Sequence, residues 1–467
     1  VASEENFKRS REWIAECHNS HPACRGSNRS MLPSRVLKIS DEGNSVRLID
    51  AFDGKYAALS YCWGKEPQTI ITTKRSLDQW KKDIPIQDLP QTIKDAIFTT
   101  YKLGILYLWV DSLCILQDSW DDQKMEIPRM SEIYHGAYVT ISAACAEDCH
   151  QGFLHRRQPK IAAIPCAYTD GSLGILNLYQ VFGVVPEPIH KRAWTLQEHV
   201  KSCRILEYGT QQLRRICRGD PDNAEILKHY DPAKGIWTIR MVPKMILTYW
   251  RRLVLDFTSR GIGHATDRPL AIHSIAMEYQ RILNVKYLNG LWGGEFFSSE
   301  LLWERDTSRE PAQRPNMPHI PSWSWFSVQE TINKWREWPS DYCDDNFRYR
   351  DASPGSCMLN VSGRLREAIW TVSRRFLLFP GRLEDQCVAE TIADAVESAF
   401  DVSKPIIVTT LEILSKLSGG IAVGLVLSRE ANGHYRRLGL FWTSTECHYD
   451  VVQEWLSRFQ NGDIVIV

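Results

Sequence analysis

Three side chains near the N-terminus have the types and the spacing of metal ligands. Cys17, His21 and Cys24 lie within a single stretch of eight residues. Thiolates and imidazoles are the usual ligands of structural zinc, which takes four of them in a tetrahedron. The fourth would have to come from a distant part of the chain, for example Cys217 or Cys203. The pattern leaves two interpretations open: a structural zinc site or a group of packed thiols.

A second group of polar side chains follows an apolar run. Residues 105–110 read Ile-Leu-Tyr-Leu-Trp-Val, as expected for a strand that is buried on both faces. The polar residues that come next are Asp111, Ser112, Gln117 and Asp118. Ligands of open α/β sheets bind outside the carboxyl ends of the strands, so these side chains are candidates for substrate binding. A charged Asp111 there needs a partner, which Arg129 or Arg192 could supply, and a purely structural Asp–Arg pair or helix cap is the alternative.

Two aromatic residues occupy a comparable place after another strand. Residues 57–61 are a short β-prone run, and Tyr61 and Trp63 stand at its end. Aromatic rings in this position can stack on a nucleobase or on a nicotinamide ring. The other interpretation is that both rings are packed in the core.

The elements that would position these residues alternate between strands and helices. Strands are predicted at 35–39, 57–61, 105–110, 138–144 and 203–208. Helices are predicted at 5–17, at 90–103, at 122–136 and from residue 192 onward, with a loop at 147–190. Strands and helices that alternate with short connections predict an α/β fold, a mostly parallel sheet flanked by helices.

Length and patterning divide the chain into four expected parts. A chain of 467 residues is too long for one hydrophobic core, since single cores rarely exceed about 250–300 residues. The parts are an N-terminal segment at 1–50, an α/β domain at 51–215, a helical region at 216–320 and a β-rich region at 321–467. The last should be antiparallel, with short strands such as 323–328 and turn signals such as Asn432-Gly433.

Composition argues against two classes of partner. Lys plus Arg and Asp plus Glu both number 56, and no long basic run occurs, which disfavours nucleic-acid binding. No apolar run approaches the roughly 18 residues of a membrane span. The 13 cysteines are scattered and odd in number, which favours reduced thiols. Together with a polar start that has no signal-peptide pattern, this predicts a cytoplasmic protein.

Five segments, taken together and in order, resemble the HET domain of fungal heterokaryon-incompatibility proteins. They cover residues 56–64, 89–97, 103–118, 130–143 and 192–198. Residues 287–292 and 321–325 also look like segments that accompany this domain. The resemblance extends to about residue 330 and is loose beyond it.

The resemblance implies a candidate catalytic residue. HET domains are similar to TIR domains, some of which cleave NAD with the glutamate of a Trp-Cys-x-x-Glu segment. Residues 194–198 have that spacing, with Thr195 in place of Cys, so Glu198 would be catalytic and Trp194 would share its helix face. A carboxylate near the ribose can stabilise the oxocarbenium-like state of nicotinamide–ribose cleavage. The alternative is a Trp in the core and a solvated Glu in a salt bridge.

Three functions are compatible with these features. The first is an incompatibility effector with a TIR-like domain that triggers cell death by consuming NAD as a substrate, with no cofactor required. The second is a HET-like protein of secondary metabolism that binds a small metabolite and guides a cyclisation or condensation. The third is a non-catalytic interaction module. The expected partners are a second copy of the chain or an incompatibility partner protein.

Overall fold

The chain forms two compact units, Val1–Met241 and Val242–Val467. The computed structural model describes residues 1–24, 32–50, 53–157, 161–167, 169–179, 187–219, 230–231, 236–237, 243–335, 342–344, 346–350, 356–381, 386–397, 404–416, 421–443 and 447–467. Among these residues, no helix combines the length and the apolar character that crossing a lipid bilayer requires.

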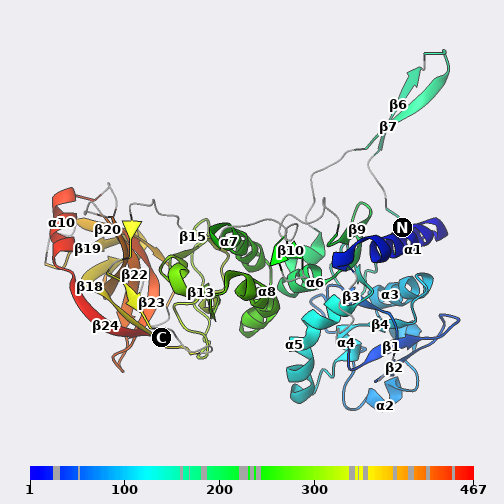
Figure 1. The fold of residues 1–467 in the computed structure, drawn as a ribbon, viewed down its shortest axis with the longest axis horizontal. Helices are drawn as coiled ribbons and strands as arrows, with labels where there is room; N and C mark the ends of the chain where they lie inside the picture. The colour runs from blue at the N-terminus through cyan, green and yellow to red at the C-terminus, as the bar shows by residue number, and fades with distance from the viewer. Residues whose placement is uncertain are drawn as a thin grey trace. The chain divides into compact units, whose positions relative to one another are not determined.

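The first unit is built on a seven-stranded sheet with the order β2-β1-β4-β3-β5-β8-β9 (Figure 1). Its four central strands are β4 (Tyr107–Trp109), β3 (Tyr56–Ser60), β5 (Val139–Ser142) and β8 (Arg204–Tyr208). These four strands run parallel to one another, with Ala57 of β3 paired to Leu108 on one side and to Val139 on the other. Every residue of β3 and β5 is buried, as expected for strands covered on both faces. The predicted parallel sheet is therefore confirmed.

Antiparallel strands close both edges of this sheet. They are β1 (Val36–Ile39), β2 (Val46–Ile49) and β9 (Leu213–Cys217). Strand β1 pairs with both β2 and β4, and β9 pairs with β8. The strand predicted at 35–39 is thus present, and residues before the central α/β pattern supply part of the same sheet.

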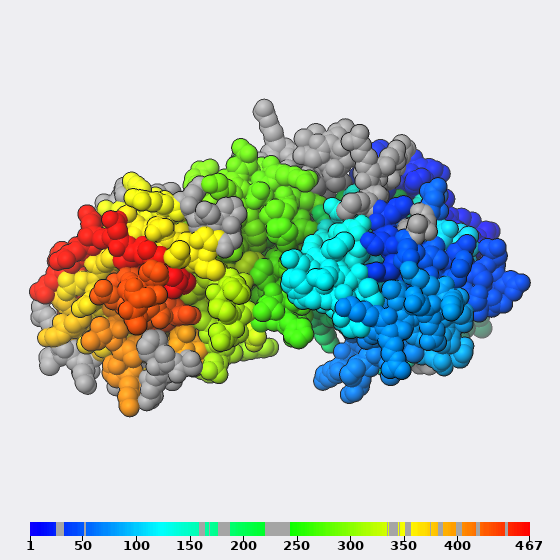
Figure 2. Space-filling view, turned by 90° about the horizontal axis from the view of Figure 1, so that it is seen from below, coloured from blue at the N-terminus to red at the C-terminus, as the bar shows by residue number. Residues whose placement is uncertain are grey.

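Helices cover both faces of the sheet (Figure 1). Their bounds are α1 (Glu4–Ser20), α2 (Leu77–Trp80), α3 (Gln91–Lys102), α4 (Asp111–Cys114), α5 (Trp120–Gly136) and α6 (Ala193–Lys201). Helices α1 and α3 share one face, where the rings of Phe7 and Phe98 meet at 5.7 Å. Helix α5 packs with α6 on the other face, and its outer side forms the cyan surface in Figure 2. The chain steps from β3 to β4 in one direction and from β4 to β5 in the other, so right-handed crossovers place α3 and α5 on opposite faces.

The loop predicted at 147–190 is wrong in part. It contains an antiparallel hairpin of β6 (Ile161–Ala167) and β7 (Leu173–Tyr179), with Ala167 paired to Leu173. The signal for this turn is the dipeptide Asp170-Gly171. Gly171 has a φ of 83°, and Asp170 Oδ1 accepts a hydrogen bond of 2.9 Å from the backbone of Ser172.

The second unit begins with helices. They are α7 (Pro243–Ser259), α8 (Arg268–Leu283) and α9 (Phe297–Glu300). Trp250 of α7 is fully buried and packs edge-on against Trp292 at 5.1 Å. Short strand pairs follow, namely β12 (Tyr287–Leu288) with β13 (Leu291–Trp292) and β14 (Trp303–Arg305) with β15 (Ile332–Trp335).

The strand predicted at 323–328 is wrong. The segment contains a 3-10 turn at Trp325–Ser327, because the Ser324 hydroxyl caps the backbone N–H of Phe326 at 3.0 Å. The indole of Trp325 donates to the carbonyl of Gly290 at 2.8 Å. Side-chain hydrogen bonds therefore hold this segment, in place of the backbone hydrogen bonds between strands that its aromatic residues suggested.

A nine-stranded sheet forms the C-terminal part, with every pairing antiparallel except that of β23 with β24. This confirms the predicted antiparallel β region. Its longer strands are β18 (Leu359–Thr371), β20 (Cys387–Ala393), β21 (Ile406–Lys416), β22 (Ala422–Arg429), β23 (Tyr435–Trp442) and β24 (Gln460–Ile466). Helix α10 (Tyr449–Ser457) packs Trp455 against Phe441. Its shorter strands are β16 (Tyr342–Cys343), β17 (Arg348–Tyr349) and β19 (Phe376–Leu378). The strands β10 (Tyr230–Asp231) and β11 (Ile236–Trp237) form a separate antiparallel pair in the first unit.

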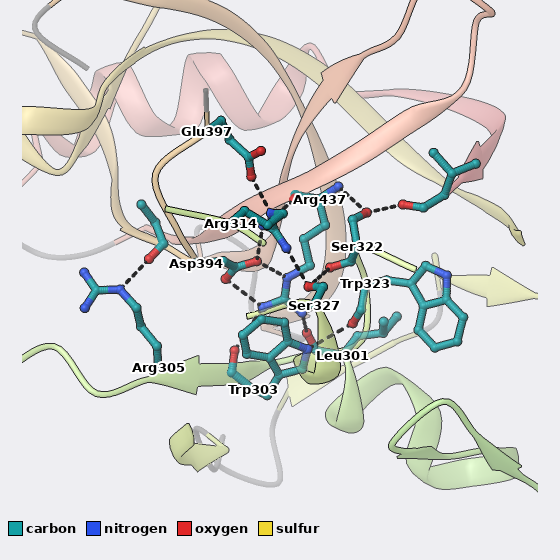
Figure 3. A network of polar contacts seen from close by, with 12 residues as sticks. Leu301, Trp303, Arg305, Arg314, Ser322, Trp323, Ser327, Asp394, Glu397 and Arg437 are labelled. Carbon is teal, nitrogen blue, oxygen red and sulfur yellow. Dashed lines mark hydrogen bonds and ion pairs between the residues drawn. The ribbon is translucent and has the colours of Figure 1, made fainter. Parts of the chain in front are cut away.

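The second unit contains a buried ion pair within a network of polar contacts (Figure 3). The Arg437 guanidinium is fully buried and donates to both carboxylate oxygens of Asp394, at 2.8 and 3.2 Å. It also donates to the carbonyls of Leu301 at 2.6 Å and Trp303 at 3.0 Å, and lies 3.7 Å from the centre of the Trp303 ring. Arg314 lies 3.8 Å from the same carboxylate. Arg437 thereby joins β23 to the segment around β14.

We expect Asp394→Ala to destabilise the second unit by about 3–5 kcal/mol, because it leaves the Arg437 charge buried without its partner. The matched control is Glu430→Ala, which removes the carboxylate of an ion pair whose side chains are 38–40% exposed and should cost less than about 1 kcal/mol. Calorimetry measures the unfolding transition of each variant and compares it with that of the wild type. Equal effects would show that the buried pair does not hold this unit together.

Candidate functional site

The carboxyl ends of β3 and β4 and the start of α6 meet at one polar cluster. Ser60 and Tyr61 are at the end of β3, and Asp111 begins the short helix α4 directly after β4. Helix α6 supplies Arg192, its N-cap residue, and Glu198. Three separate segments of the sequence therefore contribute polar side chains to the edge where parallel sheets bind ligands.

Glu198 is the most deeply buried carboxyl group of this cluster. It is 5% exposed, and its Oε2 accepts a short hydrogen bond from the Ser60 hydroxyl. Burial raises the pKa of Glu198 from 4.5 to about 7. The hydrogen bond from Ser60, the charge of Arg192 and the hydroxyl of Tyr134 lower that pKa but do not offset the loss of hydration. Near neutral pH, Glu198 therefore exists in both its protonated and its ionised form.

Asp111 is the second carboxyl group. Its Oδ2 accepts the indole N–H of Trp63 at 2.8 Å, and its Oδ1 accepts the backbone N–H of Ser112 at 2.7 Å. Loss of hydration raises its pKa, while the charge of Arg192 and the Trp63 hydrogen bond lower it. The carboxylate thus holds the Trp63 ring in place just beyond the carboxyl end of β3.

Tyr61 belongs to the polar network rather than to an open aromatic wall. Its ring is 2% exposed, its hydroxyl donates to Ser112 Oγ at 3.0 Å, and it accepts the amide of Gln68 at 3.0 Å. Burial raises the pKa of Tyr61 well above 10, and the charge of Asp111 raises it further. Tyr61 is therefore a neutral group that holds Ser112 beside Asp111.

Arg192 is the cation of the cluster. Its guanidinium donates to the Tyr61 carbonyl, and its charge lowers the pKa of both Asp111 and Glu198. Arg129, the other partner considered for Asp111, instead pairs with Glu126 at 2.9 Å. The Arg192 guanidinium thus acts electrostatically on both Asp111 and Glu198.

The remaining predicted residues lie around this network. The Gln117 amide donates to the backbone carbonyls of Asp111 at 3.1 Å and Ile115 at 2.9 Å, so it supports the turn after β4. Asp118 is exposed and caps the backbone N–H of Lys74 at 2.8 Å, which is a structural role. Trp194 is half-buried and packs against the core of the first unit.

Two members of the cluster were missed by sequence reasoning. Ser60 and Tyr134 both lie in segments that carried the family resemblance, but neither received a role there. Ser60 is the last residue of β3, and the Tyr134 hydroxyl donates to the Leu59 carbonyl at 2.9 Å beside Glu198. The position of each residue could have indicated its role. Ser60 places a hydroxyl at the carboxyl end of a buried parallel strand, and Tyr134 lies on the buried face of α5.

The structure also brings together the predicted metal ligands. Potential ligand atoms of Cys17, His21, Cys24 and Cys217 all lie within 4.8 Å of one another. Cys203, the other candidate for fourth ligand, lies beside His135 instead, with 3.6 Å between its sulfur and Nδ1. Of the two cysteines considered for the fourth position, Cys217 is the one that lies beside the other three side chains.

One segment of the first unit matches a known protein family. Residues 56–198 match the family described as heterokaryon incompatibility protein (HET). No curated protein and no solved structure matches the chain. The matched segment contains every residue of the network from Ser60 to Glu198, whereas the four potential metal ligands lie outside it.

We expect Glu198→Gln to change how stability depends on pH. The folded pKa of about 7 is above the ordinary value of 4.5, so between these values the folded state binds more protons than the unfolded state. This contribution to stability is fully present below pH 4.5 and is lost as the pH rises through about 7, by about 1.4 kcal/mol for each unit of pKa shift.

Calorimetry of wild type and Glu198→Gln at pH 5 to 8 measures this effect. The wild type should lose stability relative to the variant as the pH rises. The control is Glu132→Gln, which changes an exposed carboxyl on α5. Its stability should depend on pH in the same way as that of the wild type. A Glu198→Gln curve that also runs parallel would contradict the raised pKa.

Proposed function

We propose that the HET domain of this chain is a TIR-like effector of heterokaryon incompatibility, which cleaves NAD at the nicotinamide–ribose bond and so triggers cell death. The HET match supports the incompatibility-type role. The observation that carries the proposed chemistry is the placement of Glu198 and Asp111 at the carboxyl ends of parallel strands, both under the influence of the Arg192 charge. Ligand sites of open α/β sheets occur at this edge.

Glu198 is suited to stabilise a developing cation. When the bond between ribose and nicotinamide breaks, its electron pair goes to the nicotinamide nitrogen and positive charge develops on the ribose. An ionised Glu198 beside the ribose attracts that charge strongly, since the site is largely shielded from water. Ser60 fixes one carboxylate oxygen by its hydrogen bond, so little reorientation is needed during the reaction.

Asp111 is suited to the second half of the reaction. Water adds to the ribose carbon and must lose a proton. The pKa of Asp111 is raised by loss of hydration, which makes its carboxylate a better proton acceptor than an ordinary aspartate. Trp63, held by Asp111, is the aromatic side chain best placed to stack on nicotinamide, and the half-buried Trp194 is the second.

Access to Glu198 requires rearrangement of its neighbours. The side chain is 5% exposed, and the small hollow beside it is lined by Ser60, Thr195 and His199 among others. NAD is much larger than this hollow, so binding has to move side chains of α6. Assembly with a second copy or with a partner protein is a way to supply the energy for that movement, and activity should then depend on protein concentration.

We expect Glu198→Gln to lower the rate of nicotinamide release by about 10²–10³, the usual effect of removing one electrostatic contact to a transition state. Gln keeps the volume and can still accept the Ser60 hydrogen bond. Nicotinamide release from NAD is measured over a range of protein concentrations, with Glu132→Gln as the control for an exposed carboxyl of the same domain. An undiminished rate removes Glu198 from the mechanism, and no release at any concentration favours an adaptor or a metabolite-binding protein.

The rate should also depend on pH in a defined direction. The proposed role needs the ionised carboxylate, and the pKa of Glu198 is about 7. The rate should therefore rise about tenfold per pH unit below that pKa and level off above it. Glu198→Gln should lose this rise from any residual activity. A wild-type rate that falls between pH 6 and 8 would indicate that the protonated form is the active one.

A further inference from the structure

We infer that Cys17, His21, Cys24 and Cys217 bind one structural zinc ion. Cys17 is in the last turns of α1, Cys24 ends a 3-10 turn (Pro22–Cys24), and Cys217 is the last residue of β9. The three thiols form a small buried cluster of their own. None of them is in a disulfide in the structure. Three cysteines and one histidine are a common ligand set of structural zinc.

The spacing of these atoms is close to what zinc requires. A tetrahedral zinc with bonds of about 2.3 Å to sulfur and about 2.0–2.1 Å to nitrogen holds its ligand atoms about 3.5–3.8 Å apart. The Cys217 sulfur lies 3.3 Å from His21 Nδ1, and all four ligand atoms fall within 4.8 Å of one another. Small shifts of side chains would complete the tetrahedron, with Nδ1 as the ligating nitrogen.

The surroundings are those of a metal–thiolate centre. The backbone N–H of Gly219 donates to the Cys24 sulfur at 3.1 Å, and such second contacts orient metal ligands. A side chain at Gly219 would collide with the His21 ring, because its Cβ would lie 2.5 Å from the ring. Arg204 donates to the Cys24 carbonyl and places a positive charge beside the site. Three thiolates and one zinc carry a net charge of about −1, which this charge balances.

A second group of possible ligands has a different explanation. His190, His199 and Glu207 also lie within 4.8 Å of one another. Glu207, however, is already in an ion pair with Arg214, and it lies 3.4 Å from His190 Nε2. A carboxylate that is neutralised by a guanidinium has little charge left for a metal ion. We therefore expect one zinc per chain, not two.

The zinc would tie the two flanks of the HET segment together. His21 and Cys217 are 196 residues apart, one before and one after residues 56–198. Strand β9 pairs with β8, which follows α6 and its Glu198. Fixing β9 to α1 removes freedom from a very long loop of the unfolded chain, since closing such a loop costs entropy. The metal would thus stabilise the edge of the sheet that supports α6.

The experiment is elemental analysis of the full chain, purified under reducing conditions with zinc supplied and free zinc then removed. We expect about one zinc per chain. X-ray absorption at the zinc edge of the wild type should show three sulfur ligands at about 2.3 Å and one nitrogen at about 2.0–2.1 Å. A strong chelator should lower the melting temperature, and added zinc should restore it.

Two substitutions form a matched pair. Cys217→Ser removes a proposed ligand and should lower the zinc content at least tenfold at limiting zinc, whereas Cys203→Ser removes a buried thiol just before β8 and should leave it at one. His190→Ala should also leave it at one. The wild-type measurements keep the test valid if Cys217→Ser fails to fold. A metal-free, fully stable wild type, a disulfide among the three thiols in reducing buffer, or zinc lost only from Cys203→Ser would each overturn the proposal.

Discussion

The polar cluster of the first unit depends on the burial of the Glu198 carboxyl group. Burial of an ionised carboxylate is costly unless hydrogen bonds and opposite charges compensate for the lost water. Here the compensation is incomplete: one hydroxyl from Ser60, the Tyr134 hydroxyl and the charge of Arg192 leave the pKa at about 7. The group can therefore change its charge near neutral pH, which an exposed or fully paired glutamate cannot do.

The sheet topology makes this environment possible. The chain enters the middle of the sheet at β3, crosses to β4 and then returns past β3 to β5. Adjacent parallel strands end at the same edge, so residues 60–63 and 111–112 become neighbours although α2, α3 and β4 separate them in sequence. Helix α6 then adds Arg192 and Glu198 from a third segment. Each carboxyl group thus lies on a different element, Asp111 on α4 and Glu198 on α6.

Sequence patterns predicted the elements better than the contacts between them. Apolar runs and helical periodicity correctly indicated the parallel sheet and the antiparallel C-terminal region, because burial alone determines those patterns. They failed at 323–328, where the Ser324 cap produces a turn, and at the hairpin that turns at Gly171. The choice between Arg129 and Arg192, and between Cys203 and Cys217, needed the tertiary structure. The spacing of residues along the chain does not show which distant residue will lie next to a given side chain in the folded protein.

Two groups of buried charges, one in each unit, differ in how completely their carboxyl groups are paired. Asp394 of the second unit meets the Arg437 guanidinium with both oxygens, and that guanidinium also satisfies two backbone carbonyls. This pair holds β23 against the segment around β14, which is a structural role. In the first unit, Arg192 acts on both Glu198 and Asp111 and fully compensates neither, since both pKa values stay raised. Perturbed carboxyl groups of this kind concentrate where proteins perform chemistry. The incompletely compensated pair, rather than the well-paired one, is therefore where a reaction of this chain should be sought.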